Sequence, residues 1–379
     1  MLALVVVAAG LIWITGAGEY GYWWATNSTP PTVALTAPTG PVRGTVNVTA
    51  QVGPDGRARP VEVAVDGKPL PADSQVSIDT ATLPDGEHQV SVVAEDRSWR
   101  KNRTTATAKL TTDNTPPKLT LEVIPMQVHQ GHSWLLRIRT NEQTAVEAKL
   151  GERDLPIQNG NGYGWALLGF GPSADPASLP LVVDGRDPAG NQAEVSQVIQ
   201  VTLNDWTRDE VEIPQQIASL LESDIRTKED AALLPNYQKV SPQKLWEGRF
   251  TMPVQGEIIT QFGTLRSYNG GPVVGHHGGA DIAAGQGRNV LAPARGRVVF
   301  IDKVQLRGNM VILDHGLGVF TTYAHLSAID VQVGQTVERG QPFAKVGSTG
   351  LSTGPHLHWE LWVGGANVDP LEWTERDVP

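Results

Sequence analysis

The chain has 379 residues, enough for about two to four domains, and its 40 glycines and 27 prolines indicate many turns and a mainly β fold. It contains no cysteine, which excludes disulfides, a cysteine nucleophile, a lipidated N-terminal cysteine and thiolate metal sites, so any zinc ion would be held by imidazoles and carboxylates. The formal net charge of −10 argues against a nucleic-acid partner.

The first predicted element is an apolar segment at the N-terminus. Residues 2–17 form an apolar run, and no charged residue precedes Glu19. The run is slightly short for a membrane span, but Tyr20, Tyr22, Trp23 and Trp24 would suit the membrane interface. We favour an uncleaved membrane anchor over residues 1–24, and a secretory signal is the alternative. Both interpretations predict that the rest of the chain is exported, as an extracytoplasmic protein.

From Thr29 onward, apolar and polar residues alternate as in half-buried strands. Val46, Val48 and Ala50 share one face of such a strand, and Asp66-Gly67 is a typical turn between two others. The phrase TPPTVAL at residues 29–35 returns as TPPKLTL at residues 115–121. This spacing predicts two β-sandwiches, at residues 29–114 and 115–204, which resemble bacterial immunoglobulin-like modules.

The two predicted sandwiches carry no chemistry of their own. His88, His129 and His132 are expected to be ordinary packing or surface residues. The modules are therefore expected to act as spacers that hold the C-terminal domain away from the membrane.

Residues 205–249 are predicted to form a short helical connector. Pro214, followed by Ile217, Leu220 and Leu221, indicates an amphipathic helix with proline in its first turn. Ser241-Pro242 before Trp246 predicts the start of another helix. The connector is expected to be a hinge or a strap packed on the next domain. A further interpretation is an autoinhibitory connector that restrains the domain after it, although no residue in the connector stands out as one that would block a site there.

Residues 250–374 are predicted to form an antiparallel β domain, with strands within 258–263, 298–301, 310–313, 319–323 and 356–363. The turn rhythm of residues 333–341 is typical of lipoyl and biotinyl carriers. Such carriers need an exposed lysine at a hairpin tip, whereas Lys345 lies inside a strand-like run. We therefore reject the carrier interpretation.

Six of the nine histidines lie in this domain, and four of them belong to three short patterns. His356 and His358 are two residues apart on a predicted strand, so they share a face. His277 and Asp281 are four apart across Gly278-Gly279, which favours a tight loop over a helix. His325 follows Tyr323-Ala324. Two imidazoles and one carboxylate, with a fourth position for water, are typical of catalytic zinc.

The two remaining histidines of the domain are weaker candidates. His276 could compete for the ligand role, but only His277 has the four-residue spacing to Asp281. His315 lies in a predicted hairpin connection and is given no chemistry.

Residues from about 250 to 373 resemble the lysostaphin-type (LytM-like) zinc peptidases that cut peptide bridges in bacterial peptidoglycan. The family's motifs are matched by His277, Gly279 and Asp281, by Tyr323 to Leu326, and by His356 and His358. The resemblance implies that His277, Asp281 and His358 hold Zn²⁺ and that His325 and His356 are catalytic. It covers about a third of the chain, and no position of the catalytic set is missing.

The expected activity is hydrolysis of peptide cross-links in peptidoglycan by a zinc metalloendopeptidase. One of His325 and His356 would accept a proton from water, and the other would stabilise the oxyanion or protonate the leaving amine. His356 is the better base candidate, because the strand fixes it beside His358. Arg266, Tyr268 and Asn309 are candidates for substrate binding.

Two other classes of function remain open. The first is a catalytically silent scaffold that binds peptidoglycan or activates another wall hydrolase. The second is a zinc-dependent adhesin whose modules bind the wall. The complete set of five residues argues against the former, and the lack of an aromatic cluster or charged groove in the modules argues against the latter.

Overall fold

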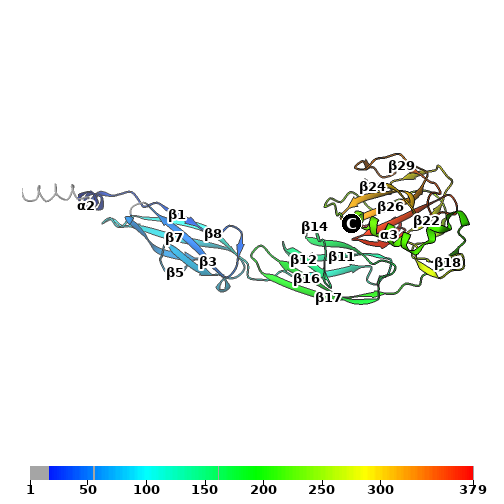
Figure 1. Cartoon of the computed structure of the whole chain (residues 1–379). Coiled ribbons are helices and arrows are strands. Elements are labelled where there is room, and N and C mark those ends of the chain that lie inside the picture. Colours follow the sequence, from blue (N-terminus) through cyan, green and yellow to red (C-terminus); the bar gives the residue numbers. More distant parts are fainter. Residues whose placement is uncertain (1–16, 54–55, 161, 379) are drawn as a thin grey trace, which may run out of the picture. The chain divides into compact units, whose positions relative to one another are not determined.

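The computed structural model describes residues 17–53, 56–160 and 162–378, which are mainly β-strands with few helices (Figure 1). They fall into two compact units. Among the described residues, the first comprises 17–53, 56–119, 140–146 and 184–194, and the second comprises 120–139, 147–160, 162–183 and 195–378. The mainly β fold expected from the composition is confirmed.

The predicted anchor over residues 1–24 lies mostly outside the described residues. Its described end belongs to helix α2 (Ala17–Thr26). Among the helices that the structure describes, none is long and apolar enough to span a membrane. The anchor therefore stays a prediction.

The first predicted module consists of two sheets that enclose one core. The strands are β1 (Val33–Thr36), β2 (Pro41–Val42), β3 (Thr45–Val52), β4 (Ala58–Val65), β5 (Lys68–Leu70), β6 (Gln75–Asp79), β7 (Gly86–Asp96) and β8 (Arg103–Thr112), with a 3₁₀ turn, η2, at Thr80–Thr82. Their orders are β1-β3-β6 and β2-β8-β7-β4-β5. Alternate residues such as Val48 of β3 and Val63 of β4 fill the core. The immunoglobulin-like assignment stays a prediction.

The second predicted module also contains two sheets. Its strands are β9 (Leu119–Ile124), β10 (Val128–His129), β11 (Ser133–Thr140), β12 (Ala145–Leu150), β13 (Arg153–Asp154), β14 (Gln158–Gly160), β15 (Tyr163–Gly169), β16 (Ala177–Arg186) and β17 (Gln192–Thr202). Their orders are β14-β15-β11-β9 and β10-β17-β16-β12-β13.

Strands β11 and β15 pack directly on the C-terminal domain. Leu135, Trp165 and Leu167 belong to the same buried cluster as the core of that domain. Ser133 Oγ accepts a hydrogen bond of 2.9 Å from Trp373 Nε1, and the Ser133 carbonyl accepts one of 2.7 Å from Arg376. These strands are therefore part of one packed unit with the C-terminal domain, a contact that the spacer prediction did not include.

The connector is a strap on the C-terminal domain. It contains β18 (Arg208–Val211), the 3₁₀ helix η3 (Gln215–Leu221), α3 (Ser223–Leu233) and the 3₁₀ helix η4 (Leu234–Tyr237). Strand β18 pairs in parallel with β20 (Leu265–Tyr268), which in turn pairs with β21 (Val273–His276). Of the two alternatives that the sequence left open, the structure selects the strap.

Two helix predictions in the connector need correction. The segment after Pro214 is a 3₁₀ helix, stabilised by a bond from Ile217 N–H to the Pro214 carbonyl, and the α-helix begins only at Ser223. No helix begins at Ser241. That segment is extended because Trp246, 1% exposed, packs into the core against Trp373.

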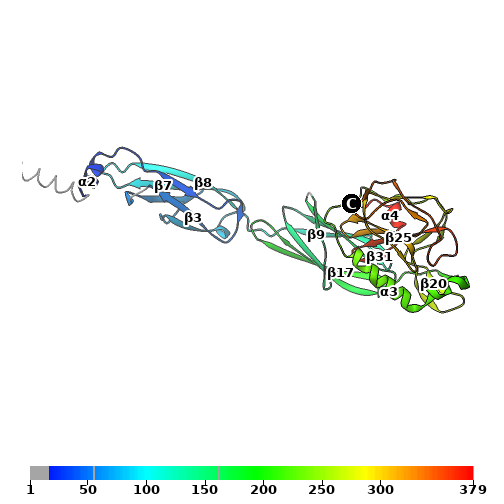
Figure 2. The ribbon, with the colours of Figure 1, turned by 45° about the horizontal axis from the view of Figure 1, so that its top comes forward.

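The C-terminal domain, coloured yellow to red in Figure 2, is built on one large sheet. Its strands are β19 (Ile258–Thr260), β22 (Ala280–Ala283), β24 (Gly296–Val304), β25 (Gly308–Gly316), β26 (Val319–Leu326), β28 (Thr336–Val337) and β30 (His356–Val363), in the order β19-β22-β30-β26-β25-β24-β28, and β31 (Ala366–Val368) pairs with β30. A smaller sheet, β23-β29-β27, contains β23 (Asn289–Leu291), β27 (Ala328–Ile329) and β29 (Pro342–Lys345), and α4 (Glu372–Glu375) follows. The strands predicted in this domain are confirmed, and Lys345 ends a strand.

Candidate metal centre

The pairing of three neighbouring strands gathers the histidine motifs. Asp281 of β22 lies directly opposite His358 of β30, and His356 lies opposite Ala283. On the other side of β30, His358 is paired with Ala324 of β26, so His325 comes next in that strand. Asp281 and His325, which lie 77 and 33 positions before His358 in the sequence, therefore become its neighbours through antiparallel register alone.

His277 reaches the same place from a loop between β21 and β22. Backbone hydrogen bonds of 2.8 Å join His277 N–H to the Thr264 carbonyl and Gly263 N–H to the His277 carbonyl. The loop lies tightly on β30: a Cβ atom at Gly279 would be 2.4 Å from the Trp359 carbonyl oxygen. Only glycine fits there, so the glycines between His277 and Asp281 permit the close approach that the sequence predicted.

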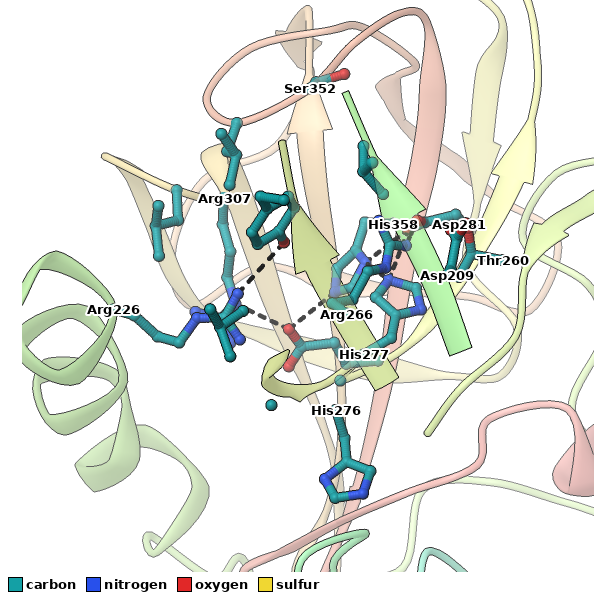
Figure 3. A pocket seen from close by; sticks show the side chains of 18 of the residues that line it. Asp209, Arg226, Thr260, Arg266, His276, His277, Asp281, Arg307, Ser352 and His358 are labelled. Carbon is teal, nitrogen blue, oxygen red and sulfur yellow. Dashed lines mark hydrogen bonds and ion pairs between the residues drawn. The ribbon is translucent and has the colours of Figure 1, made fainter. Parts of the chain in front are cut away.

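Three donor atoms form a nearly equilateral triangle (Figure 3). His277 Nε2 lies 3.0 Å from His358 Nδ1 and 3.0 Å from Asp281 Oδ1, and His358 Nδ1 lies 2.8 Å from Asp281 Oδ1. A tetrahedral zinc ion with bonds of about 2.0–2.1 Å needs donors about 3.3 Å apart. The donor types fit zinc, and the triangle is a few tenths of an ångström tighter than this spacing, with one face left for a further ligand.

The imidazole of His277 is oriented by its other nitrogen. Its Nδ1–H donates to the Gln261 carbonyl at 3.0 Å, which leaves the Nε2 lone pair facing the triangle. Burial lowers the pKa of His277, although Asp281 opposes this effect. A neutral imidazole with a free lone pair is the form that binds a metal.

The two oxygens of the Asp281 carboxylate have different partners. Its Oδ2 accepts a hydrogen bond of 2.7 Å from Arg266 Nη2, while Oδ1 faces the two imidazoles. Burial opposes the charged form, but His277 and His358 hold the pKa of Asp281 well below its usual value. Arg266, predicted to bind substrate, thus contacts a candidate ligand and orients it.

His358 is oriented by a carboxylate that the sequence analysis missed. Its Nε2–H donates to Glu360 Oε1 at 3.1 Å, so Nδ1 faces the triangle. Burial opposes protonation, but Asp281 and Glu360 raise the pKa of His358 to about 9, so a proton and a metal ion compete for this site. Glu360 lies two residues after His358 on the same strand, and the period of two was a signal that could have identified it.

His325 and His356 form a second pair beside the triangle. Their ring centroids are 4.7 Å apart, and the His325 and His358 centroids are 5.8 Å apart. His325 Nδ1–H donates to the Thr349 carbonyl at 2.7 Å, and His356 Nδ1–H donates to the Gly354 carbonyl at 2.8 Å. In both rings Nε2 is therefore the atom free to accept a proton.

The backbone at His325 is unusual for a non-glycine residue, with φ of +59°. Such left-handed residues cost free energy and are found where function requires a fixed direction. Burial, together with the neighbouring His356 and His358, lowers the pKa of His325 to about 3. His325 is therefore a neutral hydrogen-bond acceptor at physiological pH.

A pocket runs from this centre to the connector. It is lined by residues 209–213, Arg226 and Asp230 of the connector, and by Arg266, Tyr268 and Thr260 beside the histidines. Of the predicted substrate-binding residues, Arg266 and Tyr268 line this pocket. Asn309 is not among the lining residues. Its side chain donates to the Leu326 carbonyl at 2.9 Å and supports the turn that carries His325.

Two histidines of the C-terminal domain, His276 and His315, lie outside the centre. His276 turns toward Ser173, whose Oγ lies 2.9 Å from its Nδ1, and packs against Trp206. His315 is fully buried, with Nδ1–H donating to the Arg295 carbonyl and Nε2 accepting from Thr321 Oγ1. Both positions agree with the choice of His277 and with a structural task for His315.

Arg226 provides a cation in the wall of the pocket. Its Nη2 lies 3.4 Å from Tyr268 Oη, and among the residues that the structure describes it forms no ion pair with a carboxylate. The two other arginines of the pocket, Arg266 and Arg307, are both paired with carboxylates. The pocket can therefore receive an anionic group at Arg226.

Comparison with known proteins places these residues in a family. The model of peptidase family M23 matches residues 275–370. The peptidoglycan DD-endopeptidase ShyB of Vibrio cholerae is 39% identical over 126 residues, which are 32% of this chain and 28% of that protein. The murein hydrolase activator NlpD of Escherichia coli is 34% identical over 125 residues, which are 33% of this chain and 31% of that protein.

Among solved structures, the catalytic domain of the antimicrobial peptidase lysostaphin from Staphylococcus simulans is 30% identical. The match covers 38% of this chain and 97% of the lysostaphin chain, with a TM-score of 0.26. The chain spans about a quarter of the length of the curated relatives it matches. The matches to ShyB and NlpD thus concern about a third of this chain.

Proposed function

The C-terminal part of the chain is matched by the model of peptidase family M23 at residues 275–370, and from this premise we propose that the chain is a zinc-dependent endopeptidase that hydrolyses peptide cross-links of bacterial peptidoglycan. One observation carries the proposal. The three donor atoms of His277, Asp281 and His358 lie within 3.0 Å of one another, and two further imidazoles stand beside them with Nε2 free.

In this proposal His277, Asp281 and His358 hold the zinc ion. When bound, the ion would polarise the scissile carbonyl and lower the pKa of a water molecule. The chain's own residues orient the donors: the Gln261 carbonyl fixes the ring of His277, Arg266 fixes the carboxylate of Asp281, and Glu360 fixes the ring of His358.

We assign the general base to His356. Its Nε2 lies 3.7 Å from Asp281 Oδ1, so the carboxylate would stabilise the imidazolium that forms when His356 takes a proton from water. The Nδ1–H bond to Gly354 keeps the Nε2 lone pair directed at the site. Once protonated, the same nitrogen can donate to the leaving amine.

His325 has a different task in this mechanism. Its pKa of about 3 makes protonation unfavourable, and its Nδ1–H is engaged by Thr349. A neutral imidazole of this tautomer accepts a hydrogen bond at Nε2. It is therefore suited to orienting the attacking water, with His356 as the proton acceptor.

The pocket supports a substrate with carboxylates. Peptide stems of peptidoglycan carry free carboxylates, and Arg226 offers a guanidinium in the pocket wall that has no carboxylate partner in the described part of the chain. We propose that Arg226 binds such a group, and that Tyr268 shares the same wall. Location in the cell envelope, with the N-terminal segment as membrane anchor, belongs to this proposal because peptidoglycan lies there.

The second candidate is an activator of another wall hydrolase. The similarity to a murein hydrolase activator supports it. The complete set of five residues, each oriented by its own hydrogen bond, favours the enzyme, because a silent scaffold has no need for oriented imidazoles.

The decisive experiment is digestion of purified peptidoglycan with the chain from Asn27 onward, with and without added zinc, followed by mass spectrometry of released muropeptides. We expect zinc-dependent loss of cross-linked dimers, and the products identify the bond that is cut. A zinc-loaded chain that leaves the dimers intact but stimulates a separate wall hydrolase would favour the activator.

A further inference from the structure

Helix α3 of the connector is joined to the candidate metal centre by a continuous series of charged groups. The series begins at Glu229, whose side chain is 5% exposed. Its Oε2 accepts from the backbone N–H of Leu306 at 2.6 Å, and its Oε1 accepts from the backbone N–H and the guanidinium of Arg307 at 3.2 and 3.0 Å. A buried carboxylate with three donors is a rigid attachment point.

The second member of the series is Arg307. One edge of its guanidinium contacts Glu229 and Asp230 of α3, and its Nε donates to Glu360 Oε1 at 2.8 Å. The side chain is only 17% exposed, so these ion pairs are poorly screened by water. Because the guanidinium is planar, its orientation on α3 fixes the direction of the bond to Glu360.

The third member is Glu360, which is 1% exposed. Its Oε1 receives the Arg307 bond and the Nε2–H of His358 at 3.1 Å, and its Oε2 accepts from Trp362 Nε1 at 2.8 Å. A carboxylate held in this way accepts a hydrogen bond from the Nε2–H of His358, and Nδ1 is then the atom that faces His277 and Asp281. The partner of a ligand imidazole sets its tautomer and ring orientation.

We propose that Glu229 of the connector is a positioning residue for the metal centre, acting through Arg307 and Glu360 on the tautomer and orientation of His358. The connector then helps to orient a ligand of the centre, and it also lines the pocket beside it. This inference rests on the proposed metal role of His358. It assigns the connector a supporting task, distinct from the autoinhibition considered from the sequence.

The test uses the full chain with Glu229→Gln, which keeps the side-chain shape but replaces one acceptor oxygen by a donor. The matched control is Asp224→Asn, which removes the exposed pair with Lys228 on the same helix without contacting Arg307. Zinc affinity is measured by competition with a chelator, and the Co²⁺-substituted proteins are compared by their visible absorption bands. Circular dichroism reports whether each variant is folded.

We expect Glu229→Gln to lower zinc affinity by up to about tenfold and to change the Co²⁺ bands while the fold is retained. Tenfold is the lower end of the effect of a direct partner of a ligand histidine, and Glu229 acts on His358 through Arg307 and Glu360. Asp224→Asn should match the wild type. If Glu229→Gln fails to fold, Arg307→Lys serves instead, because a single ammonium cannot reach both Glu229 and Glu360 in a fixed orientation. Unchanged zinc affinity and unchanged Co²⁺ bands in a folded variant would overturn the proposal.

A readout without metal separates this inference from the proposed function. The ¹⁵N shifts of selectively labelled histidine are recorded above pH 9, where an imidazole with a pKa of about 9 becomes neutral, and are assigned through His358→Gln. They report whether the neutral His358 carries its proton on Nε2. We expect the Nε2–H form in the wild type and a mixture of tautomers in Glu229→Gln. A wild type that shows the Nε2–H form but cleaves no peptidoglycan would refute the proposed function alone, whereas identical shifts in both proteins would refute the positioning.

Discussion

At the scale of single residues, the buried histidines of the C-terminal domain differ by the atom that each one leaves free. Carbonyl groups fix Nδ1–H in His277, His325 and His356, so Nε2 points into the site. Glu360 accepts the hydrogen bond from Nε2–H of His358, so in this ring it is Nδ1 that points into the site. The same side chain thus becomes a ligand or a proton acceptor according to one hydrogen bond.

Replacing the two kinds of histidine should separate binding from turnover. We expect His358→Ala to abolish zinc retention and cleavage, because one of three donors is lost. His325→Ala should retain zinc but reduce turnover by about a hundredfold or more, the size of a lost acid–base or positioning partner. Metal content by mass spectrometry and muropeptide release measure the two effects. Cleavage by His358→Ala would disprove its assignment as a ligand.

His315 should make the stability of the domain depend on pH. Burial lowers the pKa of His315 from the ordinary value of 6.5 to about 4, so the unfolded chain binds the proton more tightly than the folded protein. The stabilisation is therefore complete above pH 6.5 and is lost as the pH falls toward 4, by up to about 3 kcal/mol. Urea unfolding between pH 4 and 7 measures it. His315→Gln should be less dependent on pH in this window, and equal dependence would contradict the assignment.

Arg226→Gln tests the proposed recognition of a carboxylate. The guanidinium lies in the pocket wall and contacts none of the three donor residues. We expect a KM about tenfold higher with little change in kcat or zinc affinity, since the lost interaction is present equally in the bound substrate and in the transition state. An amidated peptide substrate should lose the difference between the two proteins. If KM is unchanged, the substrate carboxylate does not bind at Arg226.

At the scale of elements, the centre depends on the loop that joins His277 to Asp281. The loop can lie against β30 only because Gly279 has no side chain. The Gly263 and Thr264 backbone bonds then hold His277 at the correct height above the strand. The ligand on the loop is thus positioned by contact with the strand that carries the other imidazole.

Gly279→Ala should therefore disturb the centre. The new Cβ would lie 2.4 Å from the Trp359 carbonyl oxygen, so the loop must move. We expect a loss of about 1–3 kcal/mol in stability and weaker zinc binding. Gly285→Ala is the control, since its Cβ meets nothing within 4 Å. Thermal unfolding and chelator competition compare the two, and equal behaviour would show that the loop is able to adjust.

At the scale of the molecule, the C-terminal domain shares its core with strands from the preceding module. Leu135, Trp165 and Leu167 are buried within the same cluster as Phe250 and Trp373. The connector adds the Glu229–Arg307 ion pair and the stacking of Tyr237 on Trp362, with ring centroids 4.0 Å apart. The domain matched by the family model is therefore only part of a larger packed unit.

This packing predicts how fragments behave. A fragment of residues 250–379 would expose the apolar surface covered by Leu135, Trp165 and Leu167 and would lose helix α3. We expect it to unfold at a lower temperature and to be less soluble than a fragment of residues 116–379. Calorimetry of both fragments provides the comparison. Equal unfolding temperatures would mean that the shared core contributes little.

The sequence by itself determined the mainly β fold and the strands of the C-terminal domain, and it predicted the five residues that the strand pairing and the loop after β21 bring together. Period-two alternation identifies strands because side chains alternate between faces, and His356-Leu357-His358 places two imidazoles on one face for the same reason. Gly278 and Gly279 between His277 and Asp281 likewise indicate a tight loop, because glycine is a poor helix interior residue. These features are local, so the residue order alone specifies them.

Only the tertiary structure decided what surrounds and supports those residues. Arg266, which was expected to bind substrate, lines the pocket and also pairs with Asp281. Asn309 supports a turn, and Trp246 enters the core where a helix was predicted. Glu229 and Glu360 became partners through Arg307, although 131 positions separate them. Contacts of this kind depend on strand order and on how separate layers pack, which residue spacing along one chain does not encode.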